Sequence, residues 1–354
     1  MKTIAYCSPF VPPEWIAAHG LRPQWLRRSA ATGRMATAVG RGICPYAGAL
    51  IDAALAGLGA AALVLATTCD QMRYAAAVVE IRAWHGRRAG DVDAHGQEPA
   101  ATKDRCPVFL LNVPSMWQTA AVRELYHSEL RRLGRFLTGL GGSAPEDAEL
   151  AGLMLDYDRA RGNVYEAAAH LSGRQFAEAL AELRGAPFDV LNSRGLTAPG
   201  KTVRNTAAVP LAIVGGPLLE PDYELFDLAE HSGGRVVLDA TEGGERTMPR
   251  RFDPARVAAD PVAELADAYF DGITDVFRRP NTGFYEWLGR QLSTRSVRGI
   301  IFRRFAWCDL WHAELQRLRQ WTRLPVLDID AGPDDTAAAR RTEGRIEAFL
   351  EMLA

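Results

Sequence analysis

Residues Ile300 to Gln320 read IIFRRFAWCDLWHAELQRLRQ, an apolar run that stops at a cysteine where a helical pattern begins. An earlier stretch, Leu63 to Arg73 (LVLATTCDQMR), has the same order and leads into another helical pattern. In both stretches a short buried strand is predicted to end in Cys-Asp before a helix. This order places a thiol at the carboxyl edge of a parallel sheet, where open α/β sheets keep their sites.

A third thiol opens a helix in the same way. Cys44 lies in the segment Gly42-Ile-Cys-Pro-Tyr46, and apolar residues follow it at helical spacing. Three cysteines at three junctions between elements predict a single site formed by Cys44, Cys69 and Cys308.

Strands and helices alternate along the whole sequence. The predicted strands are residues 2–7, 62–66, 107–113, 211–214, 235–239, 297–302 and 325–329. The predicted helices are residues 13–18, the segment after Cys44, 71–85, the segment after a capping box at Ser115 to Gln118, 145–185, 222–230, 260–270 and 341–352. Alternation of this kind indicates parallel sheets with right-handed crossovers. The predicted fold class is therefore α/β, with two Rossmann-like lobes joined by a helical segment.

Three regions are expected along the chain. They are an N-terminal α/β lobe at 1–143, a helical bridge and linker at 144–205, and a C-terminal α/β lobe at 206–354. The segment from Asn192 to Asn205, rich in glycine, proline and polar residues, is the predicted boundary. PVFLLNVPS, starting at Pro107, is similar to PVLDIDAGPDD, starting at Pro325, which suggests an internal duplication with two sheet edges facing one cleft.

Composition excludes several kinds of partner. The 41 basic and 43 acidic residues give a net charge of −2, so no electrostatic case exists for nucleic acid or an anionic membrane. No apolar run approaches the roughly 20 residues that span a bilayer. The amino-terminal residues lack the apolar core of a signal peptide, and the 5 cysteines are an odd number and widely spaced. These features predict reduced thiols and a cytoplasmic location.

Three thiolates without an obvious fourth ligand suit two kinds of metal site. One is a cubane iron–sulfur cluster with an exchangeable iron, and the other is a zinc ion with an open position. Helix amino termini are expected to lower the thiol pKa and favour thiolate. Core packing is the alternative for all three, because free cysteine is often buried. Cys7 is a further candidate ligand or a core residue, and Cys106 is expected to be incidental.

Several of these segments resemble the 2-hydroxyacyl-CoA dehydratase and benzoyl-CoA reductase family, in particular the D-component of 2-hydroxyglutaryl-CoA dehydratase. The matching segments are Tyr6-Cys-Ser-Pro9, Gly42 to Tyr46, Ala66 to Arg73 (ATTCDQMR), Leu111-Asn-Val-Pro114 and the late Cys308. The resemblance extends over nearly the whole chain. It implies two Rossmann-like lobes and a [4Fe-4S] cluster, which by position would be held by Cys44, Cys69 and Cys308.

The resemblance also implies a reaction and partners. The reaction is radical elimination of water from a 2-hydroxyacyl-CoA, in which an added electron gives a ketyl radical and makes an unactivated β-proton removable. The expected partners are a homologous second subunit or a second copy of the chain, an ATP-dependent activator protein as electron donor, and the acyl-CoA substrate. Two alternatives stay open: an aryl-CoA (benzoyl-CoA) reductase subunit or cluster-bearing electron relay, and a non-catalytic partner subunit. No catalytic base is identified.

Other residues carry weaker signals. The segment Asp239 to Arg246 (DATEGGER) follows a predicted strand, and a glycine-flanked carboxylate in it is a candidate for proton transfer. The alternative is a solvated loop with an Arg–carboxylate pair. The remaining candidates are Ser8 and Glu14 for acid–base work or carbonyl binding, the pairs Arg27-Arg28, Arg87-Arg88 and Arg303-Arg304 for CoA phosphates, Gly215-Gly216-Pro217 for backbone approach to a ligand, and Trp307 and Trp311 for shielding a cluster. His312 is expected at the surface or behind the ligands.

Overall fold

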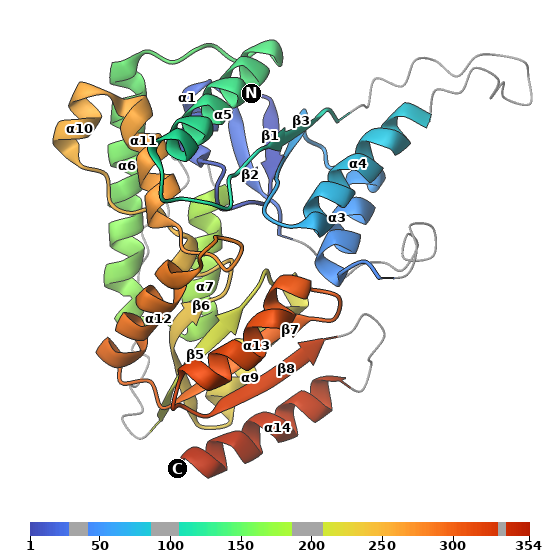
Figure 1. Cartoon of the computed structure of the whole chain (residues 1–354), viewed down its shortest axis with the longest axis vertical. Helices are drawn as coiled ribbons and strands as arrows, with labels where there is room; N and C mark the ends of the chain where they lie inside the picture. Colours follow the sequence, from blue (N-terminus) through green and yellow to red (C-terminus); the bar gives the residue numbers. More distant parts are fainter. Residues whose placement is uncertain (28–41, 86–105, 186–207, 332–337) are drawn as a thin grey trace, which may run out of the picture.

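The chain forms two lobes, each built on a parallel sheet (Figure 1). A computed structural model describes residues 1–27, 42–85, 106–185, 208–331 and 338–354. Within these ranges lie two four-stranded sheets, and all paired strands are parallel. The predicted α/β fold with two Rossmann-like lobes is therefore confirmed.

The first sheet has the order β2-β1-β3-β4. Its strands are β1 (Thr3–Tyr6), β2 (Arg22–Trp25), β3 (Ala62–Ala66) and β4 (Val108–Leu111). Every residue of β3 is buried, as expected for a central strand covered on both faces. β2 was not predicted from the sequence.

The second sheet has the order β6-β5-β7-β8, which repeats the order of the first. Its strands are β5 (Val209–Gly215), β6 (Gly234–Ala240), β7 (Gly299–Phe305) and β8 (Val326–Ala331). β4 and β8, the strands of the two similar sequence segments, occupy the same edge position in their sheets. β3 and β7, the strands that precede the two Cys-Asp pairs, occupy the same inner position.

Helices surround the sheets and join them. They are α1 (Pro13–Ala18), α3 (Pro45–Ala56), α4 (Asp70–His85), α5 (Ala120–Gly139), α6 (Asp147–Ala167), α7 (Gly173–Gly185), α9 (Glu224–His231), α10 (Pro254–Ala259), α11 (Pro261–Gly272), α12 (Thr282–Thr294), α13 (Asp309–Trp321) and α14 (Ala338–Leu353), with short 3-10 helices at Ala168–His170, Glu220–Tyr223 and Glu245–Thr247. Among the described residues, none of these helices has the length and apolarity needed to cross a membrane.

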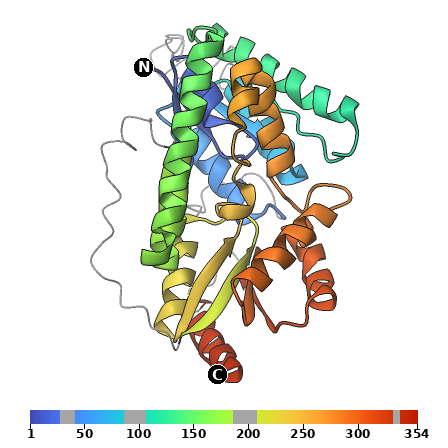
Figure 2. The ribbon, with the colours of Figure 1, turned by 90° about the vertical axis from the view of Figure 1, so that its left-hand side faces the viewer.

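The helical segment predicted at 145–185 is confirmed as α6 and α7. The long helix α6 runs beside both lobes (Figure 2), and it contacts α1 of the first lobe and also α10 and α11. Helix α7 contacts β2 of the first sheet and β6 of the second. These two helices therefore fix the two sheets relative to each other.

Helices α10 and α11 follow the second lobe's β6 in sequence but pack against the first lobe. Leu265, Ala266 and Tyr269 of α11 share one buried core with Ile4 of β1 and Tyr126 of α5. The chain thus crosses back to the first lobe before it completes the second sheet with β7 and β8. The proposed limits at residues 143 and 205 stay predictions.

A buried ion pair lies where these crossing helices meet. Arg161 of α6 donates to Glu14 of α1 over 2.6 Å, and the Tyr269 hydroxyl of α11 donates to the same carboxylate over 2.7 Å. Glu14 is fully buried. A buried charge pair of this kind is costly to break by removing one partner.

Two helix starts test the capping predictions. Asp260 caps α11, where its carboxylate accepts from the Ala263 N–H and Pro261 is the first helical residue, as predicted. The capping box at Ser115 was wrong, because α5 begins later, with Thr119 as the cap that accepts from the Val122 N–H. The predicted boundary at Asn192 to Asn205 lies outside the described residues.

Candidate functional site

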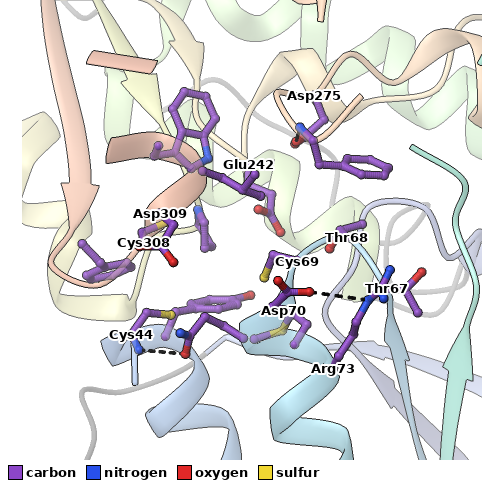
Figure 3. Close-up of a pocket in the computed structure, with 18 of the residues that line it drawn as sticks. Cys44, Thr67, Thr68, Cys69, Asp70, Arg73, Glu242, Asp275, Cys308 and Asp309 are labelled. Atoms are coloured by element: carbon purple, nitrogen blue, oxygen red, sulfur yellow. Dashed lines mark hydrogen bonds and ion pairs between the residues drawn. The ribbon is translucent and has the colours of Figure 1, made fainter. Parts of the chain in front are cut away.

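A cavity of about 280 Å³ opens where the carboxyl ends of the two sheets face each other. All three predicted cysteines line it, together with residues of both lobes (Figure 3). Its wall is completed by Pro9, Phe10, Tyr46, Thr67, Thr68, Asp70, Gln71, Met72, Arg73, Ser115, Pro217, Glu242, Asp275, Phe277, Phe305, Asp309, Leu310 and Trp311. The structure thus brings Cys44, Cys69 and Cys308 to one place.

Cys44 is the N-cap residue of α3. Its Sγ accepts from the Ala47 N–H over 3.4 Å, and Pro45 is the first residue of the helix. Its own N–H donates to the side-chain carbonyl of Gln71 on α4 over 3.1 Å. This contact ties the start of α3 to the start of α4, the helix that follows Cys69.

Cys69 and Cys308 hold equivalent positions in the two lobes. Cys69 precedes α4, and its carbonyl accepts from the Arg73 N–H. Cys308 is the N-cap residue of α13, and its carbonyl accepts from the His312 N–H over 2.8 Å. Three helix amino termini therefore carry the three thiols, and their partial positive charges favour a bound anionic group.

Burial has the largest effect on the pKa values of two of these thiols, Cys69 and Cys308. It raises the pKa of Cys69 and of Cys308 to about 12, outweighing the backbone N–H groups of Met72 and Trp311 that act in the opposite direction. The Glu242 charge raises both pKa values further. The predicted net lowering of the thiol pKa is therefore wrong for Cys69 and Cys308, because burial outweighs the effect of the helix termini. A bound metal deprotonates a thiol that it coordinates.

The three thiols have the ligand chemistry that an iron–sulfur cluster uses. In the described ranges no three His, Cys, Asp or Glu side chains are placed to hold one metal ion. A cubane cluster can bind each thiolate through a different iron and so accepts ligands that stand farther apart. Three thiols around one cavity, each at a helix amino terminus, provide the ligand chemistry of such a cluster and offset its negative charge.

Glu242 enters the cavity from the loop after β6. Its N–H donates to the Gly216 carbonyl, and its carbonyl accepts from the buried Arg184 of α7 over 3.0 Å and from the Thr247 hydroxyl over 2.7 Å. The loop is tight at Gly244, where an added Cβ would lie 2.2 Å from the Asp239 carbonyl oxygen. Arg–carboxylate pairs are present in this loop, since Glu245 pairs with Arg295 and Arg246 pairs with Asp275.

A buried guanidinium supports this wall of the cavity. Arg246 donates to Ala240 at the end of β6, to Gly215 at the end of β5 and to Asp275, which lines the cavity. The Trp311 ring lies 5.0 Å from the guanidinium. Sequence reasoning missed Arg246 as a site residue, because its partners are brought together only by the fold.

Tight packing also explains Gly216. An added Cβ there would lie 2.8 Å from Trp311, and the next residue, Pro217, lines the cavity. Trp311 is buried beside the site, whereas Trp307 is 59% exposed and has a φ of 66°. Of the two tryptophans predicted to shield a cluster, only Trp311 lines the cavity.

Several candidates lie away from the described cavity. Glu14 is held by Arg161 and Tyr269, and the Ser8 hydroxyl accepts from the Phe10 N–H. Arg303 pairs with Asp222, and Arg304 pairs with Asp328 and contacts the exposed His312. Arg27 faces the Tyr223 ring in a neighbouring small cavity, and the other named arginines lie outside the described residues.

The two remaining cysteines are not among the cavity's lining residues. Cys7 is buried in the core that also contains Ala5 and Leu50. Cys106 is partly buried against the same core, and burial raises its pKa to about 11. Both positions agree with packing roles.

The fold and the site together define the class of this protein: it is an α/β protein with two similar lobes and a thiol-lined cavity between them. A family model described as 2-hydroxyglutaryl-CoA dehydratase, D-component, matches residues 99–353, and the chain belongs to this family. Cys308 lies within the matched residues, whereas Cys44 and Cys69 precede them. No curated protein matches the chain.

Proposed function

We propose that this chain is the iron–sulfur subunit of an enzyme of the 2-hydroxyacyl-CoA dehydratase type. The observation that carries the proposal is the position of Cys44, Cys69 and Cys308, each at the start of a helix and all lining one cavity between the lobes. Membership of the dehydratase family supplies the reaction class. The three thiolates would hold a [4Fe-4S] cluster.

When held by Cys44, Cys69 and Cys308, a cluster would supply low-potential one-electron chemistry for the loss of the 2-hydroxyl group and a β-proton as water, with the electron returned at the end of the turnover. The chain's own residues bind and orient the substrate. A cavity of about 280 Å³ suits the acyl thioester end, with the rest of coenzyme A outside. Phe10, Phe277 and Leu310 offer apolar contacts, while Thr68 and Ser115 offer hydroxyl groups for polar ones.

The proposed partners follow from the same assignment. A D-component works in an enzyme of more than one component, so a homologous second subunit or a second copy of the chain is expected beside it. An ATP-dependent activator protein is the proposed electron donor, and the cytoplasm is the proposed location. Activity on an aryl-CoA but none on 2-hydroxyacyl-CoAs would instead identify a reductase subunit.

The test begins with anaerobic purification, iron and sulfide analysis, and electron paramagnetic resonance of the dithionite-reduced protein. About four irons per chain are expected, and Cys44→Ser, Cys69→Ser and Cys308→Ser should each lose iron because each removes one ligand. Cys106→Ser is the matched control and should keep the wild-type iron content. Full iron retention in all three ligand variants would refute the assignment.

Activity separates the remaining alternatives. With activator and ATP, the loaded protein is expected to dehydrate a 2-hydroxyacyl-CoA, alone or with its partner subunit. A chain that holds the cluster but binds no acyl-CoA and adds nothing to the partner's turnover would be a non-catalytic subunit.

A further inference from the structure

Four carboxylates line the described cavity, and their surroundings differ. Asp70 and Asp309 are exposed. Asp275 is engaged on both oxygens, since it accepts from Arg246 over 2.6 Å and from the Phe277 N–H over 2.9 Å. Glu242 is partly buried and reaches into the space among the thiols (Figure 3).

Glu242 lines the same cavity as thiols of both lobes, namely Cys69, which follows β3 in the first sheet, and Cys308, which follows β7 in the second. In Figure 3 its carboxylate points toward Cys69.

The backbone of Glu242 is held on both sides. Its N–H is bound by Gly216, and its carbonyl is bound by Arg184 and Thr247. Arg184 is buried and also donates to the Gly244 carbonyl over 3.0 Å. These bonds fix the main chain from which the Glu242 side chain enters the cavity.

Three thiols leave one iron of a cubane without a protein ligand. We propose that Glu242 supplies a carboxylate oxygen to that fourth iron in the resting protein, so that the ligand set is three thiolates and one carboxylate. This inference rests on the proposed function, because it requires the cluster. It makes the site symmetric, with Cys44 and Cys69 from the first lobe and Glu242 and Cys308 from the second.

The experiment compares loss of the fourth iron in wild type, Glu242→Ala and Glu242→Gln, each reconstituted anaerobically and then oxidised with ferricyanide. The appearance of the three-iron cluster is followed by electron paramagnetic resonance. Glu242→Ala is expected to lose the iron roughly 10-fold faster or more, with Glu242→Gln between it and wild type. Glu224→Ala, an exposed carboxylate at the start of α9, is the control and should match wild type.

A second measurement needs no variant. Protein labelled with carboxyl-¹³C glutamate is expected to show a ¹³C coupling to the reduced cluster in electron–nuclear double resonance. Equal iron-loss rates in wild type and Glu242→Ala, or no ¹³C coupling in wild type, would overturn the ligand assignment. If the wild-type protein binds four irons but gives one of these negative results, only the Glu242 ligand is refuted and the proposed function stands. If the wild-type protein binds no iron, both the proposed function and the Glu242 ligand are refuted.

Discussion

Asp239 is a carboxyl group enclosed at the end of β6, three residues before Glu242. Burial raises its pKa from 3.8 to about 6, although its Oδ1 accepts from the Thr241 N–H over 2.9 Å. A carboxyl group whose pKa is higher in the folded protein than in the unfolded chain destabilises the fold when it loses its proton. Stability should therefore fall as the pH rises from about 4 to 6 and stay level above that range.

Asp239→Asn should remove this pH dependence, because the amide is neutral and its carbonyl can still accept from Thr241. Above pH 6 the variant is expected to gain up to about 3 kcal/mol in free energy of unfolding, the cost of two pKa units. Urea unfolding of both proteins at pH 4.5 and 7 measures it. A wild-type stability that is flat across this range would contradict the prediction.

The two partly buried thiols, Cys69 and Cys308, give a second prediction at this scale. With pKa values of about 12, Cys69 and Cys308 are almost fully protonated at pH 8 in the metal-free protein. Their alkylation by iodoacetamide should be slower on the order of 1,000-fold than in the unfolded chain, because only the thiolate reacts. Mass spectrometry of the modified peptides with and without guanidinium measures the ratio, and equal rates would be inconsistent with the burial.

The start of α13 depends on a glycine of another element. Gly216 leaves room for the Trp311 ring, and a Cβ there would lie 2.8 Å from it. Gly216→Ala should push back the first turn of α13 and with it Cys308. We expect a loss of roughly 1–3 kcal/mol in stability, together with a lower iron content after reconstitution.

Gly283→Ala is the matched control for this effect. It lies in α12 of the same lobe, and an added Cβ there meets nothing within 4 Å. It should leave both stability and iron content near the wild-type values. A Gly216→Ala protein that behaves like this control would mean that the Trp311 ring can move aside at little cost.

Most elements could be predicted from the sequence where an apolar pattern was long or bounded by a cap. β3 and α1 were found at their observed bounds, because Ala62–Ala66 is wholly apolar and Pro13 fixes a first turn. β2 was missed because Arg22–Trp25 is a polar, proline-containing edge strand that pairs only with β1. Its strand geometry comes from its neighbour and not from its own side chains.

The same limit applies to the site. The three cysteines could be predicted because each stands at a local strand–helix or loop–helix junction that the sequence displays. The position of Glu242 could not, because Arg184, which fixes its carbonyl, is 58 residues away in the chain. A contact between distant segments leaves no periodic pattern to detect.

At the scale of the whole molecule, the buried Glu14–Arg161 pair and the Tyr269 hydroxyl fix α6 and α11 against α1 of the first lobe. Arg161→Met should cost about 3–5 kcal/mol, because it leaves the Glu14 carboxylate buried without its counter-charge. The double variant Glu14→Gln/Arg161→Met should regain much of that loss. Denaturant unfolding of wild type, Arg161→Met, Glu14→Gln and the double variant measures the coupling, and additive losses would contradict it.

The division of the site between the lobes has a consequence for how the protein is made. Cys44 and Cys69 leave the ribosome early, but Glu242 and Cys308 follow only after α6 and α7 have been synthesised. A nascent chain that has folded its first lobe thus offers two thiols of three. A cluster held by all three thiols, as proposed, would be completed only after translation has passed residue 308.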